Sequence, residues 1–76
     1  QNLDHRPVLK EVAKMFRVKI SDLLTKSRRK EIVRARWEVM RILRNEPFNF
    51  STPYIGEILN RDHSTVLYGI NKCKTN

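Results

Sequence analysis

The stretch Arg61-Asp62-His63-Ser64-Thr65-Val66 decides the fold of this chain, because it starts a second short helix directly after a first one. Asp62 is a favoured helix N-cap residue, since its carboxylate accepts from the free backbone N–H groups of the first turn. The polar residues behind it form the tip of the helix. The inward face is expected to hold the apolar residues of the segment, which are Val66, Leu67, Ile70 and Cys73.

The segment before this stretch predicts the partner helix. Ser51 or Thr52 is expected to cap it, and Pro53 fits the first turn, where a missing N–H costs nothing. Gly56 is a poor helix former, so its place inside the helix indicates close approach by a neighbouring backbone, expected to be that of the second helix. Two short helices joined by a tight turn are typical of a helix-turn-helix, here over about residues 51–75.

Three further helices are expected upstream. Asp4 is expected to cap an amphipathic helix with Pro7 in its first turn. A helix of about two turns follows, with Ile20, Leu23 and Leu24 as its apolar stripe. The longest helix, roughly Glu31 to Asn45, is the expected centre of the core.

The fold class that follows is all-α. No strand pattern is visible, and 76 residues suffice for one hydrophobic core. The prediction is a compact bundle of about five helices forming a single domain over residues 1–76. Because the chain begins at Gln1 rather than Met, we expect it to be a piece of a longer protein.

The charge of the chain predicts an anionic partner. Sixteen Lys and Arg against eight Asp and Glu give a net charge of +8, which suits DNA, RNA or an anionic membrane surface. A merely soluble basic protein is the alternative. One cysteine offers neither an internal disulfide nor a metal cluster, as expected in a reducing compartment. No apolar run approaches the roughly 20 residues that span a bilayer, so no membrane partner is expected.

Two features are candidates for DNA contact. Asp62 can accept from the exocyclic amine of cytosine, and His63 and Ser64 can hydrogen-bond base edges, although the same residues also suit an ordinary capped helix start. The basic run 26–30 can place arginine in a narrow minor groove, or it can simply be a solvated run of charges. With three arginines of the long helix it is expected to form a long positive face, the arginines being Arg34, Arg36 and Arg44. Three aromatic residues suit either the core or a sugar-phosphate backbone, namely Trp37, Tyr54 and Tyr68.

An enzymatic site is not expected. Asp62, His63 and Ser64 are consecutive, and consecutive helical residues point about 100° apart, so they cannot align as orienter, base and nucleophile. There is no carboxylate pair or glycine-rich phosphate loop. We therefore predict no catalytic residue, no cofactor and no metal.

Four motifs in order resemble the C-terminal DNA-binding domain (domain IV) of the bacterial chromosomal replication initiator DnaA. The resemblance spans about residues 7–74. The motifs are Asp22-Leu23-Leu24-Thr25-Lys26 with its basic run, Arg34-Ala35-Arg36, Ile55-Gly56 and Arg61-Asp62-His63-Ser64-Thr65-Val66-Leu67.

The resemblance implies a Trp-repressor-like helical fold that binds a short duplex element at replication origins. It implies base reading in the major groove by Asp62, His63 and Ser64, and entry of Arg28 into the minor groove. Contacts to the phosphate backbone are implied or expected for a further set, which comprises Lys26, Arg36, Pro53, Arg61, Thr65, Tyr68 and Lys72. The expected location is the bacterial cytoplasm, on the nucleoid.

The chain departs from the family pattern at several positions. The family usually has a Gly-Gly pair before Arg-Asp-His, whereas here Asn60 stands alone, so the turn is one residue shorter and is expected to tilt the recognition helix. Trp37 replaces a smaller or polar residue, and Ala35 stands where proline is frequent. Lys30 and Glu31 alter the basic run. DNA binding stays the expectation, and the target sequence stays open.

Three functional interpretations follow. The first is origin recognition, with an ATPase domain or other replication proteins as partners outside this chain. The second is a stand-alone DnaA-like regulator, carried by a phage or another mobile element. The third is a basic helical module that binds RNA or protein, in which the run from Arg61 to Val66 has no particular role.

Overall fold

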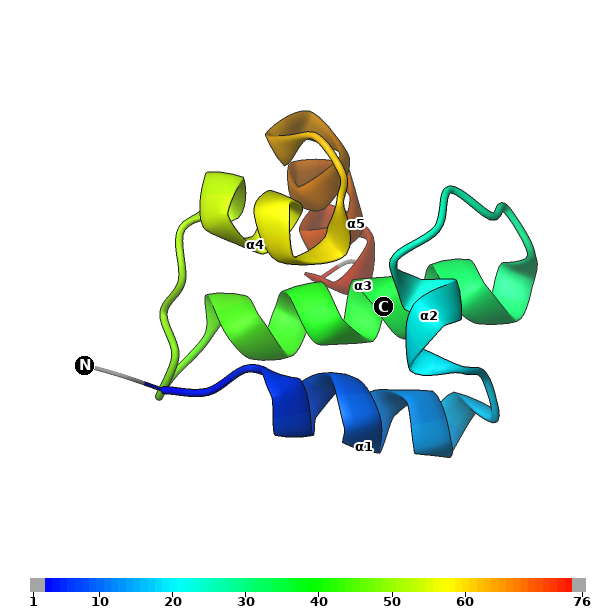
Figure 1. Ribbon diagram of the computed structural model, residues 1–76. Helices are drawn as coiled ribbons and strands as arrows, with labels where there is room; N and C mark the ends of the chain where they lie inside the picture. Colours follow the sequence, from blue (N-terminus) through cyan, green and yellow to red (C-terminus); the bar gives the residue numbers. More distant parts are fainter. Residues whose placement is uncertain (1–2, 75–76) are drawn as a thin grey trace.

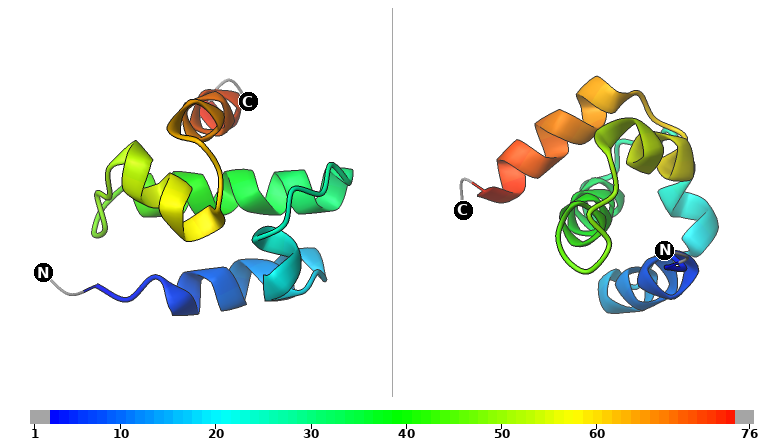
Figure 2. Two further views of the ribbon diagram at one scale, coloured as in Figure 1. Left: turned by 45° about the horizontal axis from the view of Figure 1, so that its top comes forward. Right: turned by 90° about the vertical axis from the view of Figure 1, so that its left-hand side faces the viewer.

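The long helix α3 (Lys30–Arg44) lies at the centre of the molecule, and the other four helices pack against it. The computed structural model describes residues 3–74, which contain five helices and no strand. Figures 1 and 2 show α1 on one side of α3, and α4 and α5 on the other. The bounds of the remaining helices are α1 (Arg6–Phe16), α2 (Ile20–Leu23), α4 (Thr52–Leu59) and α5 (His63–Lys74). The predicted all-α fold with a helix-turn-helix is confirmed.

Local sequence signals explain where the helices begin. Pro7 lies in the first turn of α1, where the missing N–H costs nothing. The Asp4 carboxylate accepts from the backbone N–H of Arg6 at 3.0 Å, but His5 occupies the N-cap, so the cap expected at Asp4 lies one residue later. At α4, the predicted cap is confirmed: the Ser51 hydroxyl accepts from the N–H of Tyr54 at 3.3 Å.

Two helices end in a left-handed residue that is not glycine. After α1, Arg17 has φ 56° and ψ 42°, and after α4, Asn60 has φ 59° and ψ 44°. Beyond Asn60, the N–H of Arg61 donates to the Gly56 carbonyl at 2.8 Å, which is the long bond of a Schellman motif. Asparagine tolerates this conformation better than most residues, so the short turn closes without the glycine pair. The expected tilt of α5 relative to the family stays a prediction.

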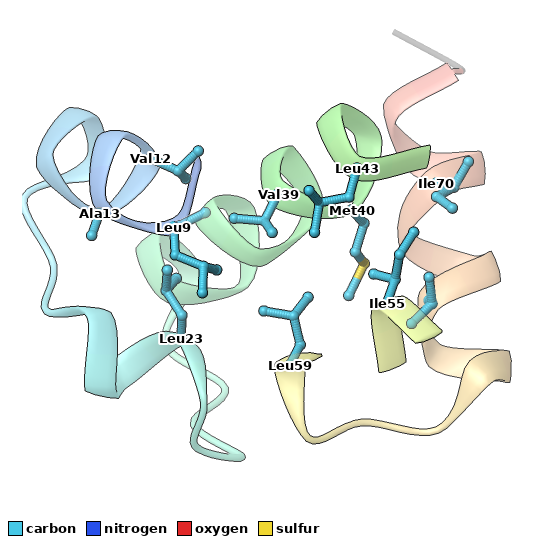
Figure 3. Close-up of a cluster of buried hydrophobic side chains, with 12 residues drawn as sticks. Leu9, Val12, Ala13, Leu23, Val39, Met40, Leu43, Ile55, Leu59 and Ile70 are labelled. Atoms are coloured by element: carbon cyan, nitrogen blue, oxygen red, sulfur yellow. The ribbon is translucent and has the colours of Figure 1, made fainter. Parts of the chain in front are cut away.

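One apolar core joins all five helices. Leu9 and Val12 of α1 and Leu23 of α2 meet one side of α3 (Figure 3). Ile55 and Leu59 of α4 and Val66 and Ile70 of α5 meet the other. The core residues of α3 are Ala35, Val39, Met40 and Leu43. Because α3 contacts every other helix, it fixes their relative positions. The helix-turn-helix and the basic run both lie on the same side of α3.

Several expected core positions differ in the structure. Leu67 was expected to turn inward and is 45% exposed, because Val66 and Ile70, four residues apart, already define the inner face of α5. In α2, Leu23 alone of the predicted stripe is buried, whereas Ile20 and Leu24 are exposed. The predicted inward side chain of Cys73 lies outside the described side chains. Within residues 3–74, no helix has the length and apolar character needed to cross a bilayer.

Gly56 is the contact point between α4 and the turn that leads into α5. A Cβ on Gly56 would fall well inside van der Waals distance of the Arg61 carbonyl oxygen. The close approach predicted from the sequence is confirmed, although the neighbouring backbone belongs to the turn rather than to α5. Since that neighbour is main chain, only glycine allows α4 and the start of α5 to lie this close.

We predict that Gly56→Ala destabilises the domain by about 1–3 kcal/mol, although alanine is normally the better helix former by up to about 1 kcal/mol. The physical reason is the collision of the added methyl group with main chain. The measurement is the free energy of unfolding from denaturant titration.

The comparison variant is Gly69→Ala in α5, whose added methyl would meet the Met40 and Trp37 side chains rather than backbone. Side chains can shift, so a smaller loss is expected there. An equal or larger loss for Gly69→Ala would contradict this account of the turn.

Candidate nucleic-acid interface

An open groove of about 750 Å³ lies between the basic run, α4 and the start of α5. Lys26 and Arg28 line it from the loop between α2 and α3, which rises on the same side of α3 as α4 and α5 (Figure 1). Asp62, His63 and Thr65 line it from the start of α5. The structure therefore brings together segments more than 30 residues apart that the sequence singled out separately.

Helix α4 supplies one wall of the groove through residues at positions i, i+3, i+4 and i+7. Pro53 was predicted as a site residue, whereas Gly56, Glu57 and Asn60 were missed. The spacing from Pro53 would have placed all four on one face of a helix, so that signal was present in the sequence.

The polar tip of α5 faces solvent beside this groove. Asp62 directly precedes the helix, and its carbonyl accepts from the N–H of Val66 at 3.2 Å. The side chains of Asp62, His63 and Ser64 are all exposed, so they are free to meet a ligand surface. Ser64 does not line the groove but follows His63 in the same first turn.

Short-range hydrogen bonds order the basic loop. The Thr25 hydroxyl donates to the Asp22 carbonyl at 2.8 Å and accepts from the N–H of Ser27 at 3.3 Å. The Ser27 hydroxyl in turn accepts from the N–H of Arg29 at 3.3 Å, and the Arg29 guanidinium pairs with Glu31 at 2.8 Å. Arg29 is thus directed to Glu31, whereas Arg28 beside it is directed to the groove.

Arg36 holds this loop from within. Its Nε donates to the Leu23 carbonyl at 3.1 Å, and its Nη2 donates to the carbonyls of Thr25 at 2.6 Å and Ser27 at 2.8 Å. The side chain is only 4% exposed. Burial, and then the nearby positive charge of Arg61, lower the pKa of this guanidinium from its ordinary value. A buried cation satisfied by three carbonyls fixes the path of the loop.

This burial corrects the expectation of a continuous positive face along α3. Arg36 was expected to be exposed beside Arg34, but the two lie about 160° apart around a helix of 3.6 residues per turn. Arg34 is exposed on the far side, and Arg44 donates to the Phe50 carbonyl at 3.5 Å near the other end of α3. The positive charge of the groove comes instead from Lys26, Arg28 and Arg61.

A second, smaller recess of about 150 Å³ adjoins the groove, between the basic loop, α3 and α5. Arg36 and Tyr68, both predicted site residues, line it together with Trp37. Lys72 lies one turn beyond Tyr68, with its Nζ 5.5 Å from the centre of that ring. The sequence left Trp37 and Tyr68 undecided between core and surface. In the structure Trp37 is partly buried against the core, whereas Tyr68 is exposed.

The described residues contain no group of three His, Cys, Asp or Glu side chains that could hold a metal ion. The groove presents three cationic side chains, the carboxylates of Glu57 and Asp62, and neutral hydrogen-bonding groups such as the Asn60 amide and the Thr65 hydroxyl. Such a set can contact phosphates and base edges.

The fold and the groove define a class of protein, the small all-helical helix-turn-helix DNA-binding domain. Comparison with known families then identifies the family: residues 6–73 match the family described as "Bacterial dnaA protein helix-turn-helix". The chain belongs to this family, and the resemblance noted from its motifs is confirmed.

A curated relative is the chromosomal replication initiator protein DnaA of Bacteroides thetaiotaomicron. The two are 44% identical over 69 residues, which cover 90% of this chain and 14% of that protein. The chain thus spans only a small part of the relative's length. No solved structure matched the chain.

We predict that Arg36→Met lowers the free energy of unfolding by about 2–4 kcal/mol, because three loop carbonyls lose a charged donor. Arg36→Lys is expected to lose most of the same amount, since a single ammonium cannot reproduce the fork of donors. Denaturant titration measures the loss, and amide hydrogen exchange at Ser27 and Arg29 should become faster.

Arg34→Met on the exposed side of α3 is the matched control and is expected to change stability by no more than about 0.5 kcal/mol. If Arg36→Met proved as stable as this control, Arg36 would not be holding the loop.

Proposed function

We propose that this domain binds double-stranded DNA sequence-specifically, with the tip of α5 in the major groove and the basic loop on the adjacent minor groove. The observation that carries the proposal is the single groove that joins Lys26 and Arg28 to Asp62 and His63. A helix-turn-helix presents the N-terminal residues of its second helix to base edges, and in α5 those residues, His63 and Ser64, are exposed.

In the major groove, three side chains read bases. The Asp62 carboxylate accepts from the exocyclic amine of cytosine. His63 hydrogen-bonds a base edge or packs on a thymine methyl group, and the Ser64 hydroxyl donates or accepts. The free N–H groups of the first turn of α5 also suit a phosphate oxygen.

In the minor groove and on the strand beside it, the loop and the turn act together. Arg28 enters the minor groove, where negative potential is enhanced when the groove is narrow. The phosphate contacts come from residues of the loop, α4 and α5, namely Lys26, Pro53, Arg61, Thr65, Tyr68 and Lys72. Arg36 contributes by holding the loop rather than by its own contact with phosphate, because its guanidinium is buried against carbonyls.

The biological role that this binding serves is recognition of a replication origin in the bacterial cytoplasm, on the nucleoid. The name of the Bacteroides relative, a chromosomal replication initiator, supports it. Opening the duplex and hydrolysing ATP would be the work of other domains or proteins, since the groove here offers only binding chemistry.

The deciding experiment is selection of bound duplexes from a random pool, followed by titration of the recovered duplex, a scrambled duplex and an RNA duplex of the same length. We expect enrichment of one short element and preference for that duplex over both controls. The logarithm of its binding constant should fall linearly with the logarithm of salt concentration, because phosphate contacts release counterions. No enrichment, or equal binding of RNA, would reject sequence-specific DNA binding.

Arg28→Ala is expected to weaken binding of the recovered duplex by about 1–3 kcal/mol, as for loss of a side chain that reaches a groove edge. Fluorescence anisotropy of a labelled duplex measures this. Arg29→Ala is the matched control, because the Arg29 guanidinium is directed to Glu31 rather than into the groove. Equal losses for the two variants would mean that only total charge matters.

His63→Ala is expected to relax base preference more than it weakens non-specific binding, because base contacts carry sequence information and phosphate contacts do not. The ratio of affinities for the recovered and scrambled duplexes should fall, with little change for the scrambled one. A proportional loss on both duplexes would show that His63 does not read a base.

A further inference from the structure

The small recess between the basic loop, α3 and α5 has a composition unlike that of the main groove. Val33, Trp37, Met40 and Tyr68 supply most of its lining, together with the guanidinium groups of Arg28, Arg36 and Arg61. The Trp37 and Tyr68 rings meet edge to face, with centroids 6.3 Å apart. Tyr68 is 57% exposed, so this wall extends from the core to solvent.

Two of the lining residues, Trp37 and Met40, pack closely against Gly69 of α5. A Cβ on Gly69 would lie 2.6 Å from Trp37 Cδ1 and would also collide with the Met40 sulfur. Because Gly69 has no side chain, Trp37 and Met40 can pack directly against the backbone of α5. The volume of about 150 Å³ has room for roughly five water-sized groups of about 30 Å³ each, which is comparable to a five-membered sugar ring.

The position of the recess indicates what reaches it. It lies between the two elements assigned to neighbouring grooves of the duplex, the loop that carries Arg28 and the start of α5. Between a major and a minor groove runs one strand of sugar-phosphate backbone. Arg28, Arg61 and Thr65 line both the main groove and this recess, so a strand bound to these residues passes over its opening.

We propose that the recess binds one deoxyribose of that strand, with the C–H faces of the sugar against Trp37 and Tyr68. The inference rests on the proposed DNA binding. The flanking phosphates meet the Arg61 guanidinium and the Thr65 hydroxyl, while Arg28 continues into the minor groove. An apolar cavity with a positive rim matches the repeating unit of DNA, in which an apolar ring lies between two anions.

The first test separates the Tyr68 ring from its hydroxyl group. Tyr68→Phe keeps the apolar wall, whereas Tyr68→Ala removes it from a largely exposed position. With the duplex recovered from the random pool, Tyr68→Ala is expected to bind about five- to tenfold more weakly than Tyr68→Phe, as apolar burial of part of a sugar implies. Equal affinities for the two variants would overturn the proposal.

The second test locates the sugar. Single nucleotides of the recovered duplex are replaced, one at a time, by 2′-O-methyl ribonucleotides, which enlarge the sugar. For the wild-type domain, one position is expected to show a clear loss of affinity, and that loss should shrink severalfold for Tyr68→Ala. This coupling distinguishes direct contact from a general change in duplex shape. Identical profiles for the two proteins would overturn the assignment.

A third test uses the fluorescence of Trp37, which is the only tryptophan in the chain. Titration with the recovered duplex should change its emission and reduce quenching by acrylamide, in step with the anisotropy of the labelled duplex. Val33→Phe, which fills the recess from α3, should reduce affinity severalfold, whereas Met15→Phe on exposed α1 should not.

The outcomes separate the two proposals. If the wild-type domain does not bind the recovered duplex in preference to the scrambled duplex and the RNA duplex, both proposals are wrong. If it binds while the Trp37 emission stays constant and the sugar profile is insensitive to Tyr68, the DNA-binding proposal stands and the recess assignment is wrong.

Discussion

The contact between the Gly56 backbone and the Arg61 carbonyl is the constraint on which the geometry of this domain depends. It sets the distance between α4 and the start of α5, and therefore where the polar tip of α5 lies relative to Pro53 and the rest of α4. The left-handed backbone conformation of Asn60 then ends α4 and lets a short turn lead directly into α5. A side chain at position 56 would separate the two helices, and the groove between them would change shape.

The groove depends equally on a buried charge. Arg36 comes from the central helix and donates to carbonyls of the loop at three points, so the rigid core and the basic run form one unit. Burying a cation lowers the stability of the fold unless its donors are hydrogen-bonded. The three bonds of Arg36 all go to backbone carbonyls, so the loop backbone itself compensates the buried charge. The second arginine of the Arg-Ala-Arg motif therefore acts on the loop through its backbone carbonyls.

Helical periodicity and capping residues predicted most of this fold. The long helix, the Ser51 cap and the meaning of Gly56 followed from local rules that the structure confirms. The errors have a common physical origin. Arg36 and Leu67 lie on faces whose burial depends on which neighbours pack against them, and that is tertiary information. A charged residue was assigned to solvent and an apolar one to the core, and packing reversed both.

The candidate site was predictable as two separate pieces. The tip of α5 and the basic run each carried recognisable chemistry, but nothing in their spacing along the chain showed that they line one groove. The contribution of α4 beyond Pro53 and the recess behind Tyr68 were missed, because both arise from helices meeting in space. Which residues face the groove is therefore decided by the fold rather than by the motifs.

The hydroxyl and carbonyl bonds of the basic loop have a consequence for the thermodynamics of recognition. Thr25, Ser27 and Arg36 already hold the loop backbone in one conformation before any partner arrives. Ordering a flexible loop on binding would cost on the order of 1–2 kcal/mol of backbone entropy for each residue that becomes fixed. In this domain that entropy is lost during folding, so affinity for the partner depends on the contacts themselves.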